Sequence, residues 1–386
     1  MIPPPTAGPV GRARASAPGR MRGIDVDGGA RRRAAARPLL TAAVALGLGL
    51  LTACAGGGSS PQRPAAGGSP SAAAPAAVRG CLRAGDPAGA AGATYGIGQT
   101  KVTFVDRSRP TDAAPDRGLA AKPDRTIPVV VSYPIAAAAA GAAPDAPAVA
   151  DASAVADASP AAGHFPLVVL SHGVLADGTV AANVIAAPLV RRGYAVATPT
   201  FPLSSGPTGT ILDLPNQPAD VSFVITSLAT WSATAATPLA GHLEASCLAI
   251  AGHSLGAATT LAAAYLSCCR DTRVKAVVSL AGVLVPFRGT FAGNPAIPLL
   301  IVHGDQDQTV PLAKSAEIFS TLRGPRYFVT LLGAGHSTMF AAQSGQTLDQ
   351  AVIAFLDAYL KGDDAALRAL PDDLRRTGRA TYQAAS

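Results

Sequence analysis

The segment that decides the fold is Cys247-Leu-Ala-Ile-Ala-Gly-His-Ser254-Leu-Gly256, and an alanine-rich run follows it. A short apolar strand, then Gly-x-Ser-x-Gly, then a helix is typical of a sharp turn that exposes a nucleophilic serine above a sheet. The glycines at 252 and 256 leave out Cβ atoms where strand and helix press together. We therefore predict a strained backbone at Ser254, with the positive end of the following helix beneath its hydroxyl.

Strands and helices alternate regularly on both sides of this turn. Strands are predicted at 101–106, 126–133, 165–171, 194–198, 247–251, 274–280, 297–303 and 326–332. Helices are predicted near 179–192, 217–235, 255–267, 312–322 and 345–361. Continuous apolar strands separated by helices indicate an α/β fold whose central sheet is mostly parallel, with helices on both faces. Residues 281–296 are too few for a helical cap, so we expect an open site and no large cap domain.

A serine nucleophile needs a base, a carboxylate that orients the base, and N–H donors for the oxyanion. The candidate base is His336, which follows the last of these strands in a loop able to fold back over the sheet. Three histidines compete with it, because they end strands beside glycines or adjoin the nucleophile: His172, His253 and His303. We interpret His172 as a structural support of its own turn.

The remaining parts of the site also have candidates. Asp305 and Asp307 both follow the strand at 297–303, and position alone does not choose between them as the acid. The expected oxyanion donors are the backbone N–H of Leu255, directly after the nucleophile, and that of Val174, in the turn after strand 165–171. No metal or cofactor is expected, because the sequence has no His-x-x-x-His and no acidic cluster with ligand spacing.

Taken together, these segments resemble the α/β-hydrolases over roughly residues 95–360. FVDRSRP, IPVVVSYP, PLVVLSHG, LVRRGYAVATP, GHSLG, HGDQDQTVP and GAGH are arranged as in the platelet-activating-factor acetylhydrolase and dienelactone-hydrolase-like branch, and several also as in bacterial cutinase-like polyester hydrolases. Hydrolases of this kind carry a pattern similar to Gly-x-x-Asp-x-x-Val-Pro, which assigns the acid to Asp307 and leaves Asp305 as a turn residue. The resemblance implies a serine carboxylesterase with Ser254, Asp307 and His336 as its triad.

The resemblance leaves the natural ester open. We expect short-to-medium acyl esters, with a polyester or a platelet-activating-factor-type phospholipid as alternatives. Acyl transfer to an alcohol is a variant of the same chemistry. From another functional class, the chain could be a catalytically silent lipoprotein that binds at a surface. A monomer is expected.

The positive charge of the chain is concentrated at its N-terminus. The formal net charge is +7, but residues 1–53 hold eight Arg and two Asp, so the remainder carries about +1. The remainder therefore lacks the basic surface that nucleic-acid binding requires.

Residues 1–53 have the pattern of an export signal. Basic residues precede an apolar run of 13 residues from Leu39 to Leu51, which is too short to cross a membrane. The end of this run, Leu51-Thr-Ala-Cys54, resembles the bacterial lipobox and implies that Cys54 is lipidated and anchors the exported protein to a membrane of the cell envelope. The alternative is an ordinary cleaved signal and a secreted protein. Residues 1–20 are interpreted as an over-extended start before Met21.

Composition predicts three further parts. Residues 54–92 are rich in Gly, Ser, Pro and Ala and are expected to form a disordered tether. Residues 93–361 are the expected catalytic domain, with a low-complexity insertion at 136–163, and residues 362–386 are expected to be a C-terminal tail.

Four cysteines follow Cys54, and an even number in an exported chain indicates disulfides. Cys247 opens the nucleophile strand, and Cys268 and Cys269 close the helix after it. That strand and helix run antiparallel and are each roughly 20 Å long, so we expect their far ends to meet and Cys247 to pair with Cys268 or Cys269. Buried free thiols are the alternative, and the role of Cys81 stays open.

Overall fold

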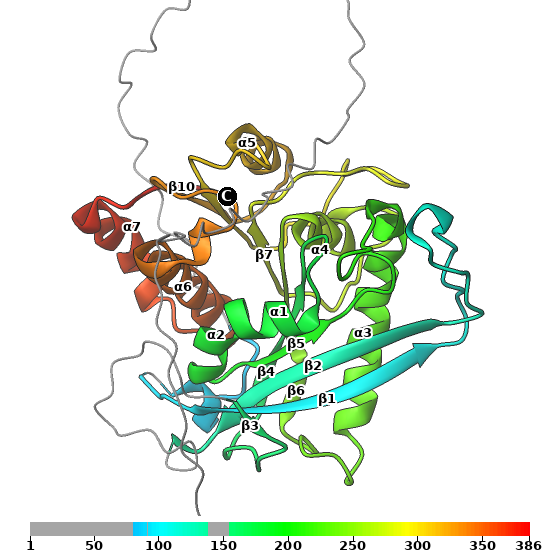
Figure 1. The fold of residues 1–386 in the computed structure, drawn as a ribbon. Coiled ribbons are helices and arrows are strands. Elements are labelled where there is room, and N and C mark those ends of the chain that lie inside the picture. Colours follow the sequence, from blue (N-terminus) through cyan, green and yellow to red (C-terminus); the bar gives the residue numbers. More distant parts are fainter. Residues whose placement is uncertain (1–79, 91, 138–153) are drawn as a thin grey trace, which may run out of the picture. The chain divides into compact units, whose positions relative to one another are not determined.

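The structure is a computed structural model that describes residues 80–90, 92–137 and 154–386 (Figure 1). The expected export signal, the lipidation site at Cys54 and most of the expected tether lie outside the described residues. Among the described residues, no helix is long and apolar enough to cross a membrane.

The described strands form one ten-stranded sheet in the order β10-β9-β8-β7-β6-β4-β5-β2-β1-β3. Its strands from β4 to β9 pair in parallel, while β1, β2 and β10 add antiparallel neighbours toward the edges. The strands are β1 (Gly96–Asp106), β2 (Arg125–Ile135), β3 (Val155–Ala156), β4 (Phe165–Ser171), β5 (Ala195–Pro199), β6 (Leu243–His253), β7 (Ala276–Leu280), β8 (Leu299–Gly304), β9 (Arg326–Leu331) and β10 (Ala380–Ala385).

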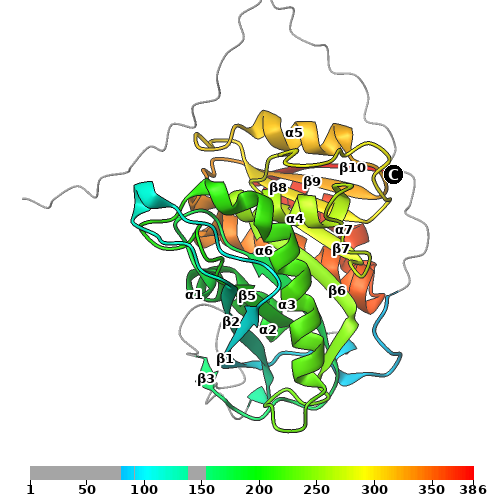
Figure 2. The same ribbon diagram turned by 90° about the vertical axis from the view of Figure 1, so that its right-hand side faces the viewer.

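Helices cover both faces of this sheet (Figures 1 and 2). They include α2 (Ala187–Arg191), α3 (Gln217–Ser232), α4 (Leu255–Tyr265), α5 (Leu312–Thr321), α6 (Ala342–Leu356) and α7 (Ala365–Thr377). Short turns are α1 (Gly178–Ala181), η1 (Pro87–Gly89), η2 (Pro115–Arg117), η4 (Ala182–Ala186), η5 (Ile211–Asn216), η6 (Thr338–Phe340) and η7 (Asp357–Lys361). Buried side chains of α3, α4 and α5 pack on one face, and those of α2, α6 and α7 on the other.

The central strand β6 shows why the sequence folds this way. Its side chains alternate between the faces, so that Cys247, Ala249 and Ala251 join one core while Leu248 and Ile250 join the other. Both faces are covered by helices, which explains the continuous apolar run in the sequence. The predicted α/β architecture with a mostly parallel sheet is confirmed. Residues 281–298, between β7 and β8, form a loop without a helix, and no cap domain is inserted there.

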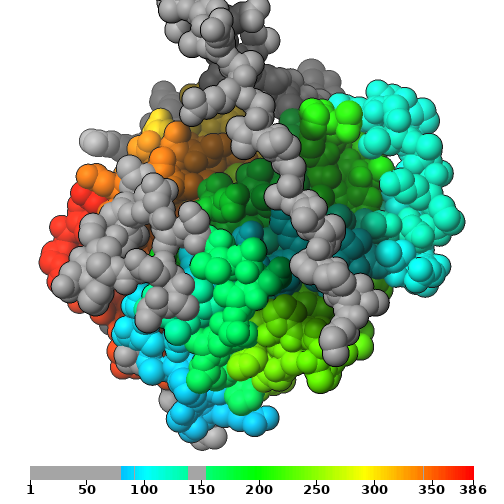
Figure 3. All heavy atoms as spheres, turned by 60° about the horizontal axis from the view of Figure 1, so that its bottom comes forward, coloured from blue at the N-terminus to red at the C-terminus, as the bar shows by residue number. Residues whose placement is uncertain are grey.

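The C-terminal segment, expected as a tail over 362–386, is part of the fold instead. Leu367, Leu370 and Leu374 lie on one side of α7 and are buried, which is the stripe of an amphipathic helix. The strand β10 then pairs antiparallel with β9. Figure 3 shows these C-terminal segments (red) on one flank and the hairpin loop between β1 and β2 (cyan) on the other.

Two other expected boundaries also shift. The last part of the expected tether packs on the body, because the N–H groups of Cys81 and Leu82 donate to the Leu360 carbonyl at 2.9 and 3.0 Å. In the expected insertion, the described residues 154–163 include β3, and Tyr133 donates to the Ala158 carbonyl at 2.8 Å.

The expected pairing of Cys247 with Cys268 or Cys269 is wrong. Cys247 is bonded to Cys81, and Cys268 is bonded to its neighbour Cys269. The physical reason is the alternation along β6. Cys247 points to the face covered by α2 and α6, whereas α4 and the turn after it lie on the opposite face. The similar lengths of strand and helix could not reveal the face to which Cys247 points.

Candidate active site

Ser254 lies in the sharp turn that the sequence predicts. It precedes α4 with φ 56° and ψ −121°, a strained conformation for a residue with a side chain. A Cβ atom at Gly252 would lie 2.2 Å from the Gly256 carbonyl oxygen, and one at Gly256 would lie 2.1 Å from that of Ser171. Only glycine fits at either position, so the backbone packing holds Ser254 in its strained conformation.

The turn after β4 passes directly beside the serine. A Cβ atom at Gly173 would lie 3.3 Å from the Ser254 Cβ. The next N–H, that of Val174, and the N–H of Leu255 make no hydrogen bond to another described residue. Neither of these two expected donors is used by another hydrogen bond within the described structure, and the turn of Val174 lies beside Ser254.

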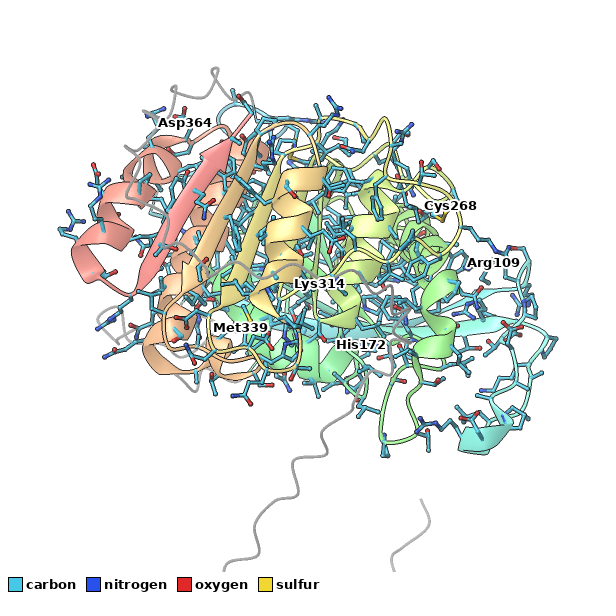
Figure 4. The ribbon with its side chains drawn as sticks, turned by 90° about the horizontal axis from the view of Figure 1, so that it is seen from above. Arg109, His172, Cys268, Lys314, Met339 and Asp364 are labelled. Carbon is cyan, nitrogen blue, oxygen red and sulfur yellow. A yellow bond between two sulfur atoms is a disulfide. The ribbon has the colours of Figure 1, made fainter. Side chains whose placement is uncertain are left out.

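His172 supports this turn. Its Nδ1 donates to the Gly173 carbonyl at 2.7 Å, and its Nε2 accepts from the Phe201 N–H at 3.1 Å. Burial lowers the pKa of His172, which keeps the ring neutral and able to make both bonds. Its place agrees with the structural role assigned from sequence. Figure 4 shows His172 and Met339, three residues after His336, at the same edge of the sheet.

The structure brings Asp307 and His336 together. The Nδ1 of His336 lies 2.7 Å from Oδ2 of Asp307, and no other described residue hydrogen-bonds its Nε2. Asp307 Oδ1 accepts from the N–H groups of Thr309 and Val310 at 2.8 and 2.9 Å. Burial raises the pKa of Asp307, but the donors from Val310, His336 and Thr309 outweigh it, so its pKa lies below the usual value. The lowered pKa favours the ionised carboxylate beside the imidazole of His336.

Asp305 has the turn role that the sequence suggests. Its Oδ1 accepts from the Gly333 N–H at 2.7 Å. Together with the Gln306 N–H, which donates to the Ala334 carbonyl at 2.9 Å, this bond ties the loop of Asp307 to the loop of His336.

His303 is a supporting residue whose role the sequence did not reveal. Its Nε2 lies 2.9 Å from the Val310 carbonyl oxygen and 3.1 Å from Asp307 Oδ2, while its Nδ1 accepts from the Ser315 hydroxyl at 2.6 Å. Burial lowers the pKa of His303, so it acts as a neutral donor to the acid. The His-x-x-x-Asp spacing at the end of a strand was the available signal.

His253 contacts His336. Its Nε2 donates to the backbone carbonyl of His336 at 3.1 Å, and the two ring centroids are 4.6 Å apart. Phe340 packs edge-on against His253 at 4.9 Å. Burial and the charge of His336 lower the pKa of His253 to about 3, which excludes it as a base near neutral pH.

The turn after β4 carries an exposed apolar side chain. Leu175, directly after Val174, is 44% exposed. Other exposed apolar side chains lie on α1, η4 and η5: Val180, Val184, Ile211 and Leu212. Within the described ranges, no group of three or more His, Cys, Asp or Glu side chains could hold a metal ion.

A family model described as PET hydrolase-like matches residues 161–374. The chain belongs to the PET hydrolase-like family. It is therefore a carboxylic ester hydrolase with an α/β-hydrolase fold. Among solved structures, a ferulic acid esterase from Streptomyces cinnamoneus is similar in fold, with a TM-score of 0.53 and 23% identity, covering 70% of this chain and 92% of that one. A search of curated proteins finds no match.

Proposed function

We propose that this PET hydrolase-like chain is a serine esterase that works through an acyl-enzyme, with Ser254 as nucleophile, His336 as base and Asp307 as orienting acid. The observation that carries the proposal is the combination of a strained, half-buried Ser254 with the His336–Asp307 hydrogen bond of 2.7 Å. A serine hydroxyl is a weak nucleophile unless a base takes its proton. The free Nε2 of His336 is the acceptor that this chemistry requires.

The reaction proceeds in two halves. Ser254 Oγ attacks the ester carbonyl carbon while its proton passes to His336 Nε2, and the oxyanion receives hydrogen bonds from the N–H groups of Val174 and Leu255. The tetrahedral intermediate collapses, the alkoxide leaves, and His336 gives it the proton. Water then attacks the acyl-enzyme with His336 again as base, and the carboxylic acid is released.

The substrate we favour is a short-to-medium acyl ester on a bulky or polymeric alcohol. The loop at 281–298 carries no cap, and Leu175, directly after Val174, offers an exposed apolar side chain in the turn. The family to which the chain belongs favours a polyester as the second candidate. A platelet-activating-factor-type phospholipid is the third, and it differs in carrying a charged headgroup.

The catalytic roles are tested with a fluorophosphonate probe, which phosphonylates an activated serine. Wild type is expected to be labelled and Ser254→Ala to remain unlabelled. Ser320→Ala is the matched control, because Ser320 on α5 is exposed and bonds only to the Glu317 carbonyl within the described structure. Absence of labelling in folded wild type would leave the silent surface-binding lipoprotein as the better explanation.

The substrate is tested with p-nitrophenyl esters from acetate to palmitate, a polyester film and an acetylated phospholipid. A maximum at butyrate to octanoate is expected, with release of soluble monomers from the film as the sign of polyester activity. A maximum at palmitate contradicts the proposed acyl preference. Adding an alcohol acceptor distinguishes acyl transfer, because transfer consumes the acyl-enzyme faster than water does.

We also propose that the protein is exported and anchored by a lipid on Cys54. The Cys81–Cys247 disulfide supports export, since disulfides persist in oxidising compartments. Expression in a bacterial host followed by detergent-phase partitioning tests the anchor. Wild type is expected in the detergent phase, and Cys54→Ala in the aqueous phase or unprocessed. Equal partitioning of both supports the ordinary cleaved signal.

A further inference from the structure

The two oxyanion donors belong to separate segments of the chain, and their separation has to be fixed within a fraction of an ångström for catalysis. We propose that Gln217, with Ser204 and Thr259, forms a buried polar bridge that sets this separation, and that Gln217 is a positioning residue for the oxyanion hole. The inference rests on the proposed function, because Val174 and Leu255 are the donors assigned there.

One half of the bridge leads from Leu255 to Gln217. Thr259 lies one turn after Leu255 in α4, and its hydroxyl is 3.2 Å from the Leu255 carbonyl oxygen. The same hydroxyl is 2.5 Å from Oε1 of Gln217. A hydroxyl has one proton to donate, so the Thr259 hydroxyl donates mainly to the nearer acceptor, Oε1 of Gln217. The first turn of α4, which carries the Leu255 N–H, is thereby tied to the first residue of α3.

The other half leads from Gln217 to the turn of Val174. Gln217 Nε2 donates to the Ser204 hydroxyl at 2.8 Å. The backbone carbonyl of Ser204 accepts the N–H of Leu175 at 2.9 Å. Leu175 has φ 67°, a conformation unfavourable for a residue with a side chain, so this bond holds a strained peptide directly after Val174. One glutamine therefore connects the supports of both donors.

The bridge is rigid because it is buried and braced. Gln217 and Thr259 are 0% exposed and Ser204 is 1% exposed, so water does not compete for these bonds. The loop that carries Ser204 is held by Asp213, whose Oδ2 accepts the Leu203 N–H at 3.3 Å. Asp213 in turn accepts from Arg125 at 3.0 Å.

Arg125 also braces α3 itself, the helix that begins at Gln217. Its Nε donates to Asp220 at 2.7 Å. Arg125, Asp213 and Asp220 are all 0% exposed. This ion cluster is buried away from the reacting atoms. Through the bridge it has a function in catalysis, because it fixes the start of α3, where Gln217 lies.

The experiment replaces Gln217 with methionine, which has a similar length and no polar group. Loss of one oxyanion donor costs about 100- to 1,000-fold in kcat, and a displaced donor should cost less. We expect Gln217→Met to lower kcat about 10- to 100-fold with KM within about two-fold, because the hole acts on the transition state. Ser204→Ala is a smaller change. We expect it to lower kcat as well, without loss of folding.

Three comparisons separate positioning from a general loss of packing. Thr259→Ser keeps the hydroxyl and should retain activity, whereas Thr259→Val should not. Thr260→Val is the matched control: Thr260 is the next residue, equally buried, but its hydroxyl donates to Ala251 in β6. The double variant Ser204→Ala/Gln217→Met should be no worse than Gln217→Met alone, because both break one bridge.

A transition-state analogue supplies the independent measurement. The Ki of a trifluoromethyl ketone, which forms an oxyanion on Ser254, should rise in Gln217→Met by the same factor as kcat/KM falls. Folded Gln217→Met and Ser204→Ala with wild-type kcat, or an equal loss in Thr260→Val, overturn the inference and leave the esterase proposal standing. Failure of wild type to react with the fluorophosphonate overturns the esterase proposal itself.

Discussion

Replacing Asp307 with asparagine should abolish most of the activity through the tautomer of His336. Oδ1 of Asp307 accepts two backbone N–H groups, from Thr309 and Val310. In the asparagine variant the amide oxygen must occupy this position, because an NH₂ group there would face two donors. The NH₂ group then replaces Oδ2 and points at the Nδ1 of His336, 2.7 Å away in wild type. Nδ1 must become the acceptor, which moves the imidazole proton to Nε2.

With its proton on Nε2, His336 cannot take the proton of Ser254. The same change in a serine protease triad leaves the geometry intact and lowers kcat about 10⁴-fold, and we expect a loss of this order here. His303 adds to the effect, since its Nε2 lies 3.1 Å from the replaced atom and would face a second donor.

The assay is kcat/KM on p-nitrophenyl butyrate, with thermal unfolding to verify folding. Asp305→Asn is the matched control, two residues earlier in the same loop. Its amide oxygen can still accept the Gly333 N–H, so activity should stay within about three-fold of wild type, as expected for a replaced turn acceptor. A loss of thousands-fold in Asp305→Asn, or none in Asp307→Asn, refutes the assignment.

Three further outcomes are expected. His253→Phe keeps a ring against His336 but removes the N–H that donates to the His336 carbonyl. It should lower kcat about ten-fold with little change in KM, and an unchanged kcat contradicts a role of His253 in positioning His336. Burial lowers the pKa values of His172, His253 and His303 below 6.5, so the unfolded chain binds more protons as the pH falls. The free energy of unfolding should therefore decrease below pH 6.5, by at most about 1.4 kcal/mol per pH unit for each histidine; urea unfolding at pH 8, 6 and 5 measures this, and a flat profile contradicts it. Replacing Cys81 and Cys247 together by alanine should destabilise the fold by about 2–4 kcal/mol, with activity retained at 25 °C. Replacing Cys268 and Cys269, which are adjacent in sequence, should lower the Tm far less in the same thermal unfolding measurement.

The sheet and the nucleophile turn were predictable because local chemistry determines them. Continuous apolar strands have to be covered on both faces, and Gly252 and Gly256 stand where a side chain would meet backbone within 2.2 Å. The choice of Asp307 over Asp305 needed the resemblance, since both aspartates follow the same strand. The structure gives each a different partner, His336 for one and Gly333 for the other.

What the sequence did not reveal depends on tertiary contacts. The partner of Cys247 is 166 residues away in the chain, and only the direction of its side chain excludes Cys268 and Cys269. The strand β10 reads Ala-Thr-Tyr-Gln-Ala-Ala, a run with little strand propensity, and it forms because β9 offers an unpaired edge. The bridge through Gln217 joins residues of three segments, and no local pattern marks it.

The disulfide between Cys81 and Cys247 determines where a mechanical load would enter the molecule. Cys247 is the fifth residue of β6 and lies six residues before His253, roughly 20 Å along the strand from the turn of Ser254. A pull on the chain upstream of Gly80 is therefore transmitted covalently to Cys247 within the central strand, and the edge strands are bypassed. β6 is clamped between β4 and β7, so such a pull acts in shear on many hydrogen bonds at once.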